Sequence, residues 1–452
     1  MSGRDALRAA VVGAGPAGFY ATDQLLDAGF EVDLFDALPT PFGLVRSGVA
    51  PDHPKLKSVT RIYEKTAAKP GFRFFGGVVL GEHVTRAELL ERYHAVMYAV
   101  GTSDDNRLGI PGEDRPGSRS ATEFVAWYNG HPEYCGHEFD LSGGRAVVVG
   151  NGNVALDVAR MLVLGSEELA PTDTADHALE GFGASTVQEV VVLGRRGPAQ
   201  AAFTNPEVRE LGELARADIE IDAAQVQAAT EPETPTARRN VELFREYAAR
   251  EPSGKSHRIE LRFLRSPVEI LGDGEDGPVT GVRVAVNRLE AGRAVPTGEE
   301  EVIECGLVVR SIGYRGRPLG DVPFDERRGL IRNDGGRVCD EGGEPCAGEY
   351  AVGWIKRGPS GVIGTNKKDA ADTVAKVLAD AEAGRLGRPS RADAEDTARW
   401  LAERAPDAVG WEGWQAIDDA ERRAGEAQGR PRVKLVRLAE LIETGRAAPA
   451  TR

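Results

Sequence analysis

Short apolar runs separated by helix-length stretches organise the N-terminal part of the chain. Apolar residues occupy 9–12, most of 31–35 and most of 96–101, with a helix-compatible stretch after the first run. Strands buried in a parallel sheet are nearly continuous apolar runs, and helices connect them. The pattern predicts a βαβ-type domain at the N-terminus.

The same pattern begins again after residue 144. Strands are predicted over 145–149 and 187–193, a helix over 156–164, and another buried strand over 307–313. Two such sets indicate two domains, with the chain crossing between them near 102–116 and again just after 313. The predicted fold class is therefore α/β, with two Rossmann-like three-layer domains.

The remaining stretches are less regular. Residues 217–303 alternate in short runs and predict a meander of strands that completes the second domain. Residues 391–448 predict a helical tail with a break at 429–432. The Pro- and Gly-rich stretch 38–57 predicts a long loop, and a loop of that length in a compact domain is usually functional.

A glycine pattern directly follows the first strand. Gly13, Gly15 and Gly18 have the G-x-G-x-x-G spacing that is typical of a dinucleotide pyrophosphate site at a helix N-terminus. Asp36 ends the second strand, where a carboxylate can accept hydrogen bonds from a ribose. We predict that the first domain binds the ADP half of a dinucleotide.

The second domain has a similar turn followed by the opposite charge. The turn GNGNVA starts at Gly150, and Arg195 and Arg196 stand where an acidic residue would bind a ribose hydroxyl. Two guanidinium groups can hold a 2′-phosphate through forked hydrogen bonds. We therefore predict FAD in the first domain and NADPH in the second, as in a flavin reductase.

Composition narrows the function classes. The net charge of −15 argues against general nucleic-acid binding, and no apolar run approaches the ~20 residues that span a bilayer. The N-terminus enters the first strand almost at once, so we expect no targeting peptide and either a cytoplasmic location, which we favour, or a mature form already trimmed. The four cysteines form no C-x-x-C pair, so they indicate neither a dithiol centre nor a metal-ligand set.

Five longer motifs carry a resemblance to a known family. In chain order they are PTPFGLVRSGVAPDHPK from Pro39, GNGNVALDVAR from Gly150, GRRGPAQAAFT from Gly194, LRFLRSP from Leu261 and GWIKRGPSGVIGTNKKDA from Gly353. Together they resemble the adrenodoxin-reductase type of ferredoxin–NADP reductase. The resemblance implies a discontinuous FAD domain, 1–104 and 316–452, into which an NADP domain, 105–315, is inserted.

The resemblance also implies which residues contact each cofactor. Those assigned to FAD are Gly13, Gly15, Ala17, Gly18, Asp36, Leu44, Val45, Val79, Trp354, Gly361, Val362 and Ile363. Those assigned to NADPH are Asn151, Gly152, Asn153, Val154, Arg195, Arg196, Glu207 and the shared Gly361. Asp36 stands where the family usually has a longer glutamate.

An active-site histidine is implied in the same way. His53 matches the family's active-site histidine, with Glu210 as its carboxylate partner and Asp157 nearby. Such a pair can tune the electrostatics of a flavin and can pass protons. No residue set points to a metal.

The implied activity is electron transfer from NADPH through FAD to a small iron–sulfur protein of the ferredoxin or adrenodoxin type. Such a partner would supply cytochromes P450 or other ferredoxin-dependent enzymes. Arg238, Arg239 and Arg245 are the predicted docking residues for this acidic partner, and the further candidates are Arg258, Arg262 and Arg265. By resemblance we expect a monomer.

Other functions stay open at this point. They are the NADPH-binding flavoprotein subunit of a glutamate-synthase-like complex, a diaphorase or quinone reductase, a flavin monooxygenase and a nucleotide-sensing protein without activity. An enzyme of the thioredoxin-reductase type would need a C-x-x-C motif, which the chain lacks.

Overall fold

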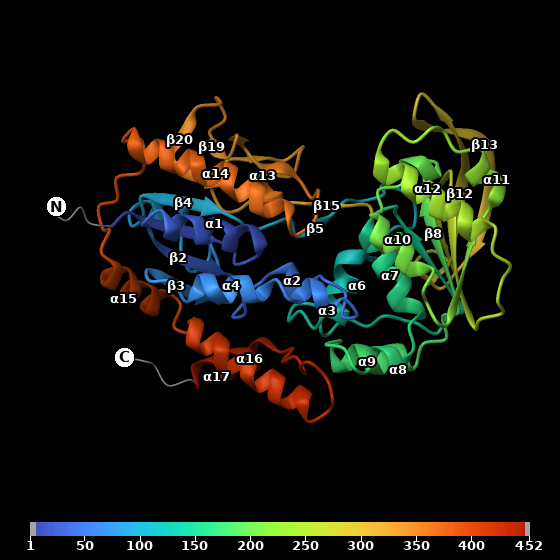
Figure 1. The fold of residues 1–452 in the computed structure, drawn as a ribbon, viewed down its shortest axis with the longest axis horizontal. Helices are drawn as coiled ribbons and strands as arrows, with labels where there is room; N and C mark the ends of the chain where they lie inside the picture. The colour runs from blue at the N-terminus through green and yellow to red at the C-terminus, as the bar shows by residue number, and fades with distance from the viewer. Residues whose placement is uncertain (1–5, 448–452) are drawn as a thin grey trace. The chain divides into compact units, whose positions relative to one another are not determined.

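The computed structural model describes residues 6–447, which form two compact units (Figure 1). The first unit contains 6–49, 53–104 and 314–447, and the second contains Ala50–Asp52 and Asp105–Gly313. The chain changes unit at β5 (Asp104–Asp105) and again just before β15 (Tyr314–Arg315). The predicted domain limits lie at the same two crossings, but they had left Ala50–Asp52 in the first domain.

A seven-stranded sheet forms the centre of the first unit. Its order is β18-β19-β20-β4-β1-β2-β3, parallel from β20 to β3 and antiparallel at the β18–β19 edge. Strand β1 lies between β2 and β4, where the strand order reverses, and open α/β sheets bind ligands at such a point. The strands are β1 (Arg8–Val12), β2 (Glu31–Asp36), β3 (Phe72–Gly76), β4 (Ala95–Tyr98), β18 (Asn333–Asp334), β19 (Arg337–Cys339) and β20 (Pro345–Ala351), with a separate pair β16 (Phe324–Asp325) and β17 (Leu330–Ile331).

Helices cover both faces of this sheet. Side chains alternate along β1, so that Ala9 and Val11 pack with α1, α14 and α16, whereas Ala10 and Val12 pack with α5 and α15. The predicted C-terminal helical tail is confirmed as far as the described residues reach, and residue 448 lies outside them. The helices are α1 (Pro16–Asp27), α2 (Leu44–Ser47), α3 (Pro54–Lys57), α4 (Thr60–Ala67), α5 (Arg86–Leu90), α13 (Trp354–Arg357), α14 (Thr365–Glu382), α15 (Ala394–Arg404), α16 (Trp411–Glu426) and α17 (Leu438–Arg446).

The second unit contains a six-stranded parallel sheet in the order β6-β14-β7-β8-β10-β9. An antiparallel sheet, β11-β12-β13, packs on it, with Val282 and Val284 in one core with Val147 and Val191. The strands are β6 (Ser118–Ser120), β7 (Arg145–Val149), β8 (Glu189–Gly194), β9 (Ala217–Ile221), β10 (His257–Phe263), β11 (Arg265–Gly272), β12 (Val279–Glu290), β13 (Arg293–Glu304) and β14 (Leu307–Arg310). The helices are α6 (Ala121–Tyr128), α7 (Asn153–Val163), α8 (Ser166–Leu169), α9 (Asp176–Gly183), α10 (Asn205–Leu211), α11 (Ala223–Gln227) and α12 (Pro235–Ala248), with a 3₁₀ turn at Pro198–Gln200.

The predicted strand meander over 217–303 is wrong for its first half. Strands β9 and β10 belong to the parallel sheet, with α11 and α12 between them, and only β11 to β13 form a meander. Helix α12 buries Ala237, Val241, Phe244 and Tyr247, a three-to-four-residue spacing that the many charged residues of this stretch obscure. The polar stretch 165–185, between β7 and β8, contains α8 and α9.

The strand register places both glycine turns in the same way. Val12 pairs with Phe35, and Gly13 N donates to Phe35 O at 2.8 Å. In the second unit Val149 pairs with Leu193, and Gly150 N donates to Leu193 O at 3.0 Å. Each turn therefore leaves its sheet at the carboxyl end of the first strand. Over residues 6–447, the helices are all too short or too polar to cross a membrane.

Candidate active site

The first glycine turn is shaped by close backbone contacts. Gly13 has φ +111, and a Cβ there would lie 2.5 Å from the carbonyl oxygen of Ala99. A Cβ at Gly18 would lie 1.9 Å from the oxygen of Gly13, so α1 reaches the strand only with glycine at that position. Gly15, by contrast, faces open space at the N-terminus of α1. The open side and the unpaired N–H groups of the helix fit a pyrophosphate.

Asp36 ties this turn to the loop that follows β2. One carboxylate oxygen accepts from Ala14 N at 2.8 Å and the other from Leu38 N at 2.9 Å. Burial raises the pKa of Asp36 to about 6, although the hydrogen bonds from Leu38 and Ala14 oppose the rise. Each oxygen keeps a further lone pair, so the carboxylate can still accept from ribose hydroxyls.

The segment Phe42–Ser47 crosses directly over the turn. Phe42 N donates to Ala14 O at 2.8 Å, and a Cβ on Gly43 would lie 3.0 Å from the Cα of Gly15. Leu44 is 47% exposed and free to contact a flavin, whereas Val45 is only 1% exposed. The side chain of Val45 packs in the core, and the flavin contact predicted for this residue stays a prediction. We call Phe42–Ser47 the crossing segment.

The loop after β20 reaches the same turn from the other side. The Cα of Gly353 lies so close to α1 that a Cβ there would be 2.6 Å from the Cβ of Ala17. Asp369 holds this loop by accepting from Gly353 N at 2.6 Å and from Lys356 Nζ at 2.9 Å. The Trp354 ring stacks on Tyr314, with centroids 5.8 Å apart.

Two features of this loop fit a bound flavin. The indole N–H of Trp354 is buried and has no hydrogen-bond partner within residues 6–447, so it is an available donor. Gly361 and Val362 are exposed, and Val362 at 57% is the most exposed of the large apolar residues described. Ile363 and the predicted Val79 are half-buried. An isoalloxazine ring needs both apolar cover and a few hydrogen-bond donors, and this set offers them.

The second glycine turn repeats the geometry of the first. A Cβ on Gly150 would lie 2.0 Å from the oxygen of Ser311, and Gly152 faces open space before α7. The side chain of Asn151 packs over Gly194, and that of Asn153 accepts from Thr204 N at 2.8 Å. The two asparagines therefore hold the loop 194–204 against the turn. Their backbone, with that of Val154, is what remains to face a pyrophosphate.

The two predicted 2′-phosphate ligands are exposed on a fixed backbone. Arg195 O accepts from Asn287 Nδ2 at 2.9 Å, and Arg196 O accepts from Leu264 N at 3.0 Å. Both side chains are exposed, and neither forms an ion pair with a carboxylate in the described part of the chain. Sequence reasoning missed Asn287, because no sequence signal links a residue of β12 to the end of β8.

The buried Arg160 forms ion pairs with the predicted acidic residues of the second unit. The guanidinium of Arg160 is 1% exposed, and its N–H groups lie 2.8 Å from Asp52, 3.1 Å from Asp157, 3.2 Å from Glu210 and 3.8 Å from Glu207. Burial alone would lower the pKa of Arg160, but Asp52, Asp157 and Glu210 hold it above its usual range. The cluster carries more negative than positive charge, which suits a site that holds or moves protons.

This cluster changes how the acidic predictions are understood. Asp157, Glu207 and Glu210 share Arg160, a residue of the motif GNGNVALDVAR to which the sequence analysis gave no role. The adenosine contact predicted for Glu207 is untested. His53 belongs to the first unit, so its pairing with Glu210 also stays a prediction.

The predicted docking arginines differ in whether they form ion pairs with neighbouring carboxylates. Arg238, Arg239 and Arg245 are all exposed on α12, but Arg239 pairs with Glu242 at 2.8 Å. The further candidates are each paired, Arg258 with Glu189, Arg262 with Glu260 and Arg265 with Glu301. Among the described residues, only Arg238 and Arg245 of this set form no ion pair.

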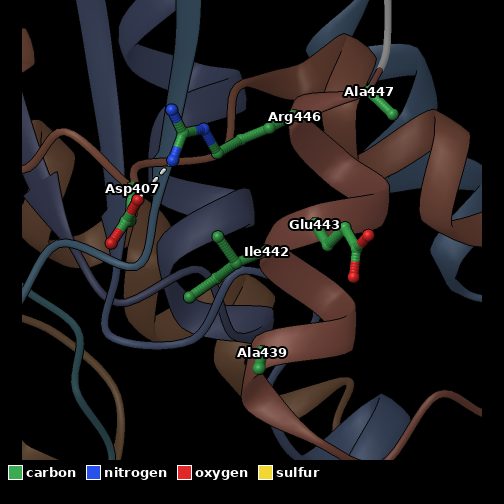
Figure 2. Close-up of a pocket in the computed structure, with 6 residues that line it drawn as sticks. All are labelled: Asp407, Ala439, Ile442, Glu443, Arg446 and Ala447. Carbon is green, nitrogen blue, oxygen red and sulfur yellow. Dashed lines mark hydrogen bonds and ion pairs between the residues drawn. The ribbon is translucent and has the colours of Figure 1, made fainter.

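A surface hollow also lies beside α17 (Figure 2). Asp407 on one side pairs with Arg446 on the other at 2.5 Å, and Ala439, Ile442, Glu443 and Ala447 complete the lining. None of the predicted cofactor residues lines it. The hollow is therefore separate from the candidate active site.

Comparisons with known proteins show the family to which the chain belongs. Residues 7–223 match the family described as pyridine nucleotide-disulphide oxidoreductase. NADPH-ferredoxin reductase FprA of Mycobacterium tuberculosis is 51% identical over 453 residues, covering 96% of this chain and 98% of that protein. The mitochondrial NADPH:adrenodoxin oxidoreductase of Salvelinus fontinalis is 41% identical, covering 97% of this chain and 91% of that protein. This chain belongs to the adrenodoxin-reductase type of ferredoxin–NADP reductases.

A solved structure supports the same conclusion for the fold of this reductase. Mycobacterium tuberculosis FprA in complex with NADPH superposes with a TM-score of 0.93 at 50% identity, covering 98% of this chain and all of that one. The predictions of fold class, of enzyme class and of FAD and NADPH as cofactors are confirmed. The glutamate-synthase-like reading is not needed, because ferredoxin reductases match the chain over nearly its whole length.

Proposed function

We propose that this reductase takes electrons from NADPH and passes them through FAD to a small acidic iron–sulfur protein of the ferredoxin type. One observation carries the proposal: the second glycine turn is followed by two exposed guanidinium groups that form no ion pair in the described residues. An acidic residue at this position would favour NADH, whereas paired arginines favour the 2′-phosphate of NADPH.

The residues of the first unit hold the flavin. FAD supplies the ability to accept a hydride and to release electrons one at a time. Gly15 and the N-terminus of α1 bind its pyrophosphate, and Asp36 accepts from its ribose. Leu44 and Val362 cover the ring, and the free indole N–H of Trp354 donates to it.

In this proposal the acidic residues around Arg160 accept and release protons. Glu210 and Asp157 are held by Arg160, which fixes their geometry and balances part of their charge. His53, the active-site histidine of the family motif, exchanges protons with Glu210. An imidazole can take up and release a proton near neutral pH, which suits that role.

The partner docks on the exposed face of α12. Arg238 and Arg245 are the unpaired positive charges on that helix, in a chain whose net charge is −15. An acidic ferredoxin is attracted to such a local basic surface and repelled elsewhere. Supply of cytochromes P450, a monomeric state and a cytoplasmic location remain predictions from the sequence.

An anaerobic titration of the flavin absorption band tests the proposal. We expect one equivalent of NADPH to bleach the wild-type flavin and NADH to require a large excess. The Arg195→Ala/Arg196→Ala variant should bind NADPH about a hundredfold more weakly, because two charge-assisted hydrogen-bond sets are lost.

NADH is the matched control, because it lacks the phosphate and its binding should not change in the variant. An unchanged affinity of the variant for NADPH would contradict the phosphate assignment. A purified wild-type protein without a flavin band would overturn the reductase proposal itself.

A further inference from the structure

Helix α16 and Lys434, which lies between α16 and α17, contact the crossing segment Phe42–Ser47 that lies over the first glycine turn. The tail and the crossing segment both belong to the first unit, although 375 positions separate Arg46 from Glu421. No sequence motif indicates a role for the tail after residue 380.

A buried carboxylate makes the main connection. The Glu421 side chain is 0% exposed, and its two oxygens accept from Arg46 at 2.5 and 2.9 Å in a fork. Glu421 also accepts from Leu435 N at 2.9 Å and from Arg432 at 2.9 Å. Burial opposes ionisation, but Arg46 and Arg432 hold the pKa of Glu421 below its ordinary value. A fully partnered buried ion pair of this kind fixes geometry, because breaking it leaves an uncompensated charge.

Three further tail residues, Lys434, Trp414 and Trp411, contact the same segment. Lys434 Nζ donates to the backbone oxygen of Arg46 at 3.2 Å. The Trp414 ring stands edge-on to Phe42 at 5.4 Å, and the guanidinium of Arg46 lies 5.3 Å from the centroid of the same Trp414 ring. Trp411 packs against Phe42 at 6.3 Å.

The segment needs such support because its backbone is strained. Phe42 has φ +84, a conformation that a bulky L-residue rarely adopts, and Gly43 follows with φ +48. A strained residue persists only where its surroundings determine it more strongly than its own preference. The rings of Trp411 and Trp414 provide part of those surroundings, together with Phe19 and Tyr63, and Phe42 is only 4% exposed.

We propose that the C-terminal tail is a clamp that holds the crossing segment in its flavin-binding conformation, with Glu421 as the positioning residue. The proposal rests on the function proposed above, in which Leu44 covers the flavin. Because the segment is already ordered before FAD binds, it loses less conformational entropy on binding.

The matched pair Glu421→Gln and Asp418→Asn tests the clamp in the full-length chain. Asp418 lies on the same helix and pairs with Arg432 and Arg422, but within residues 6–447 it forms no hydrogen bond or ion pair with the crossing segment. After reversible removal of FAD, E421Q should bind FAD about tenfold more weakly, as expected when a preordered segment becomes loose, and D418N within about twofold of wild type. Arg46→Lys, which keeps the charge but loses the fork, should resemble E421Q.

Hydrogen exchange of the FAD-bound proteins gives the second readout. The amides of Ser47 and Gly48, which donate to Gly43 O and Leu44 O, should exchange faster in E421Q and R46K but not in D418N. Equal FAD affinity and equal exchange in E421Q, R46K and wild type would overturn the clamp. Equal weakening in D418N would also overturn it, since the effect would then be general destabilisation of the tail. A wild-type chain that binds no FAD would overturn the proposed function, and the clamp with it.

Discussion

At the scale of single residues, Asp36 has a structural function in addition to its proposed contact with a ribose. Its two oxygens hold Ala14 and Leu38, so the carboxylate also fixes the turn that is to receive the pyrophosphate. Aspartate is one methylene shorter than the family's usual glutamate, and these two backbone contacts suit the shorter side chain. Because burial raises the pKa of Asp36 to about 6, its charge changes near the physiological range.

FAD affinity should therefore depend on pH through Asp36. Ribose hydroxyls donate to the ionised carboxylate, so protonation competes with FAD, and affinity should fall about tenfold between pH 7 and pH 5. In the chain without FAD the raised pKa has the opposite consequence. The protonated carboxyl stabilises the folded state at low pH, and this contribution is lost as the pH rises through about 6. Flavin fluorescence titrations across this range measure the affinity.

Asp36→Asn is the control for this pH dependence. The amide does not titrate, so its FAD affinity should be weaker but flat across the same range. A slope in D36N equal to that of wild type would assign the titration to another group, such as His53.

At the scale of elements, ion pairs decide which positive charges on α12 are available. Arg239 pairs with Glu242, whereas Arg238 and Arg245 on the same helix form no ion pair in the described residues. Exposed arginines already neutralised by a neighbour add little to the attraction of an acidic partner. Docking should therefore depend unequally on three arginines that look equivalent in the sequence.

Charge reversal on α12 tests this inequality. Arg238→Glu/Arg245→Glu should raise the KM for ferredoxin about tenfold at low salt, while Arg239→Glu should have a smaller effect. Ferricyanide reduction should stay unchanged in both variants, because a small anion needs no protein docking surface. Steady-state kinetics with both acceptors measure this. Equal loss with ferricyanide would place the damage in the reductase itself.

At the scale of the whole molecule, each of the two units contains the same kind of glycine turn after its first strand. In each unit the first glycine of the turn packs on the backbone that follows a neighbouring strand, at Ala99 after β4 and at Ser311 after β14. The second unit consists of one long insertion into the first, Asp105–Gly313, together with the short piece Ala50–Asp52. Each unit has its own sheet and core, so each should respond separately to its own ligand.

Hydrogen exchange of the complete chain should show this separation. A ligand at a hundred times its Kd stabilises the unit that binds it by about 2.7 kcal/mol and slows its slowest amides about a hundredfold. FAD should protect the core of β1, β2 and β4, and NADP⁺ that of β7, β8 and β14. The variant R195A/R196A should lose only the second protection. Uniform protection of both units by either ligand would contradict independent units.

The sequence by itself determined the elements whose signals are local. Continuous apolar strands, glycine turns and the opposite charges after them predicted two nucleotide-binding units and the two cofactors, because each signal spans only a few neighbouring residues. The arginine pair Arg195 and Arg196 could be predicted from its position at the end of a strand. The helix α12 could not, because charged residues mask its buried face.

The tertiary structure decided everything that depends on distant residues meeting. The burial of Val45, the support of Arg195 by Asn287 and the gathering of carboxylates around Arg160 all join separate elements. So does the fork between Arg46 and Glu421, which gives a role to a tail without any motif. Burial and ion pairing are set by which surfaces pack together, and a local pattern contains no information about a partner hundreds of positions away.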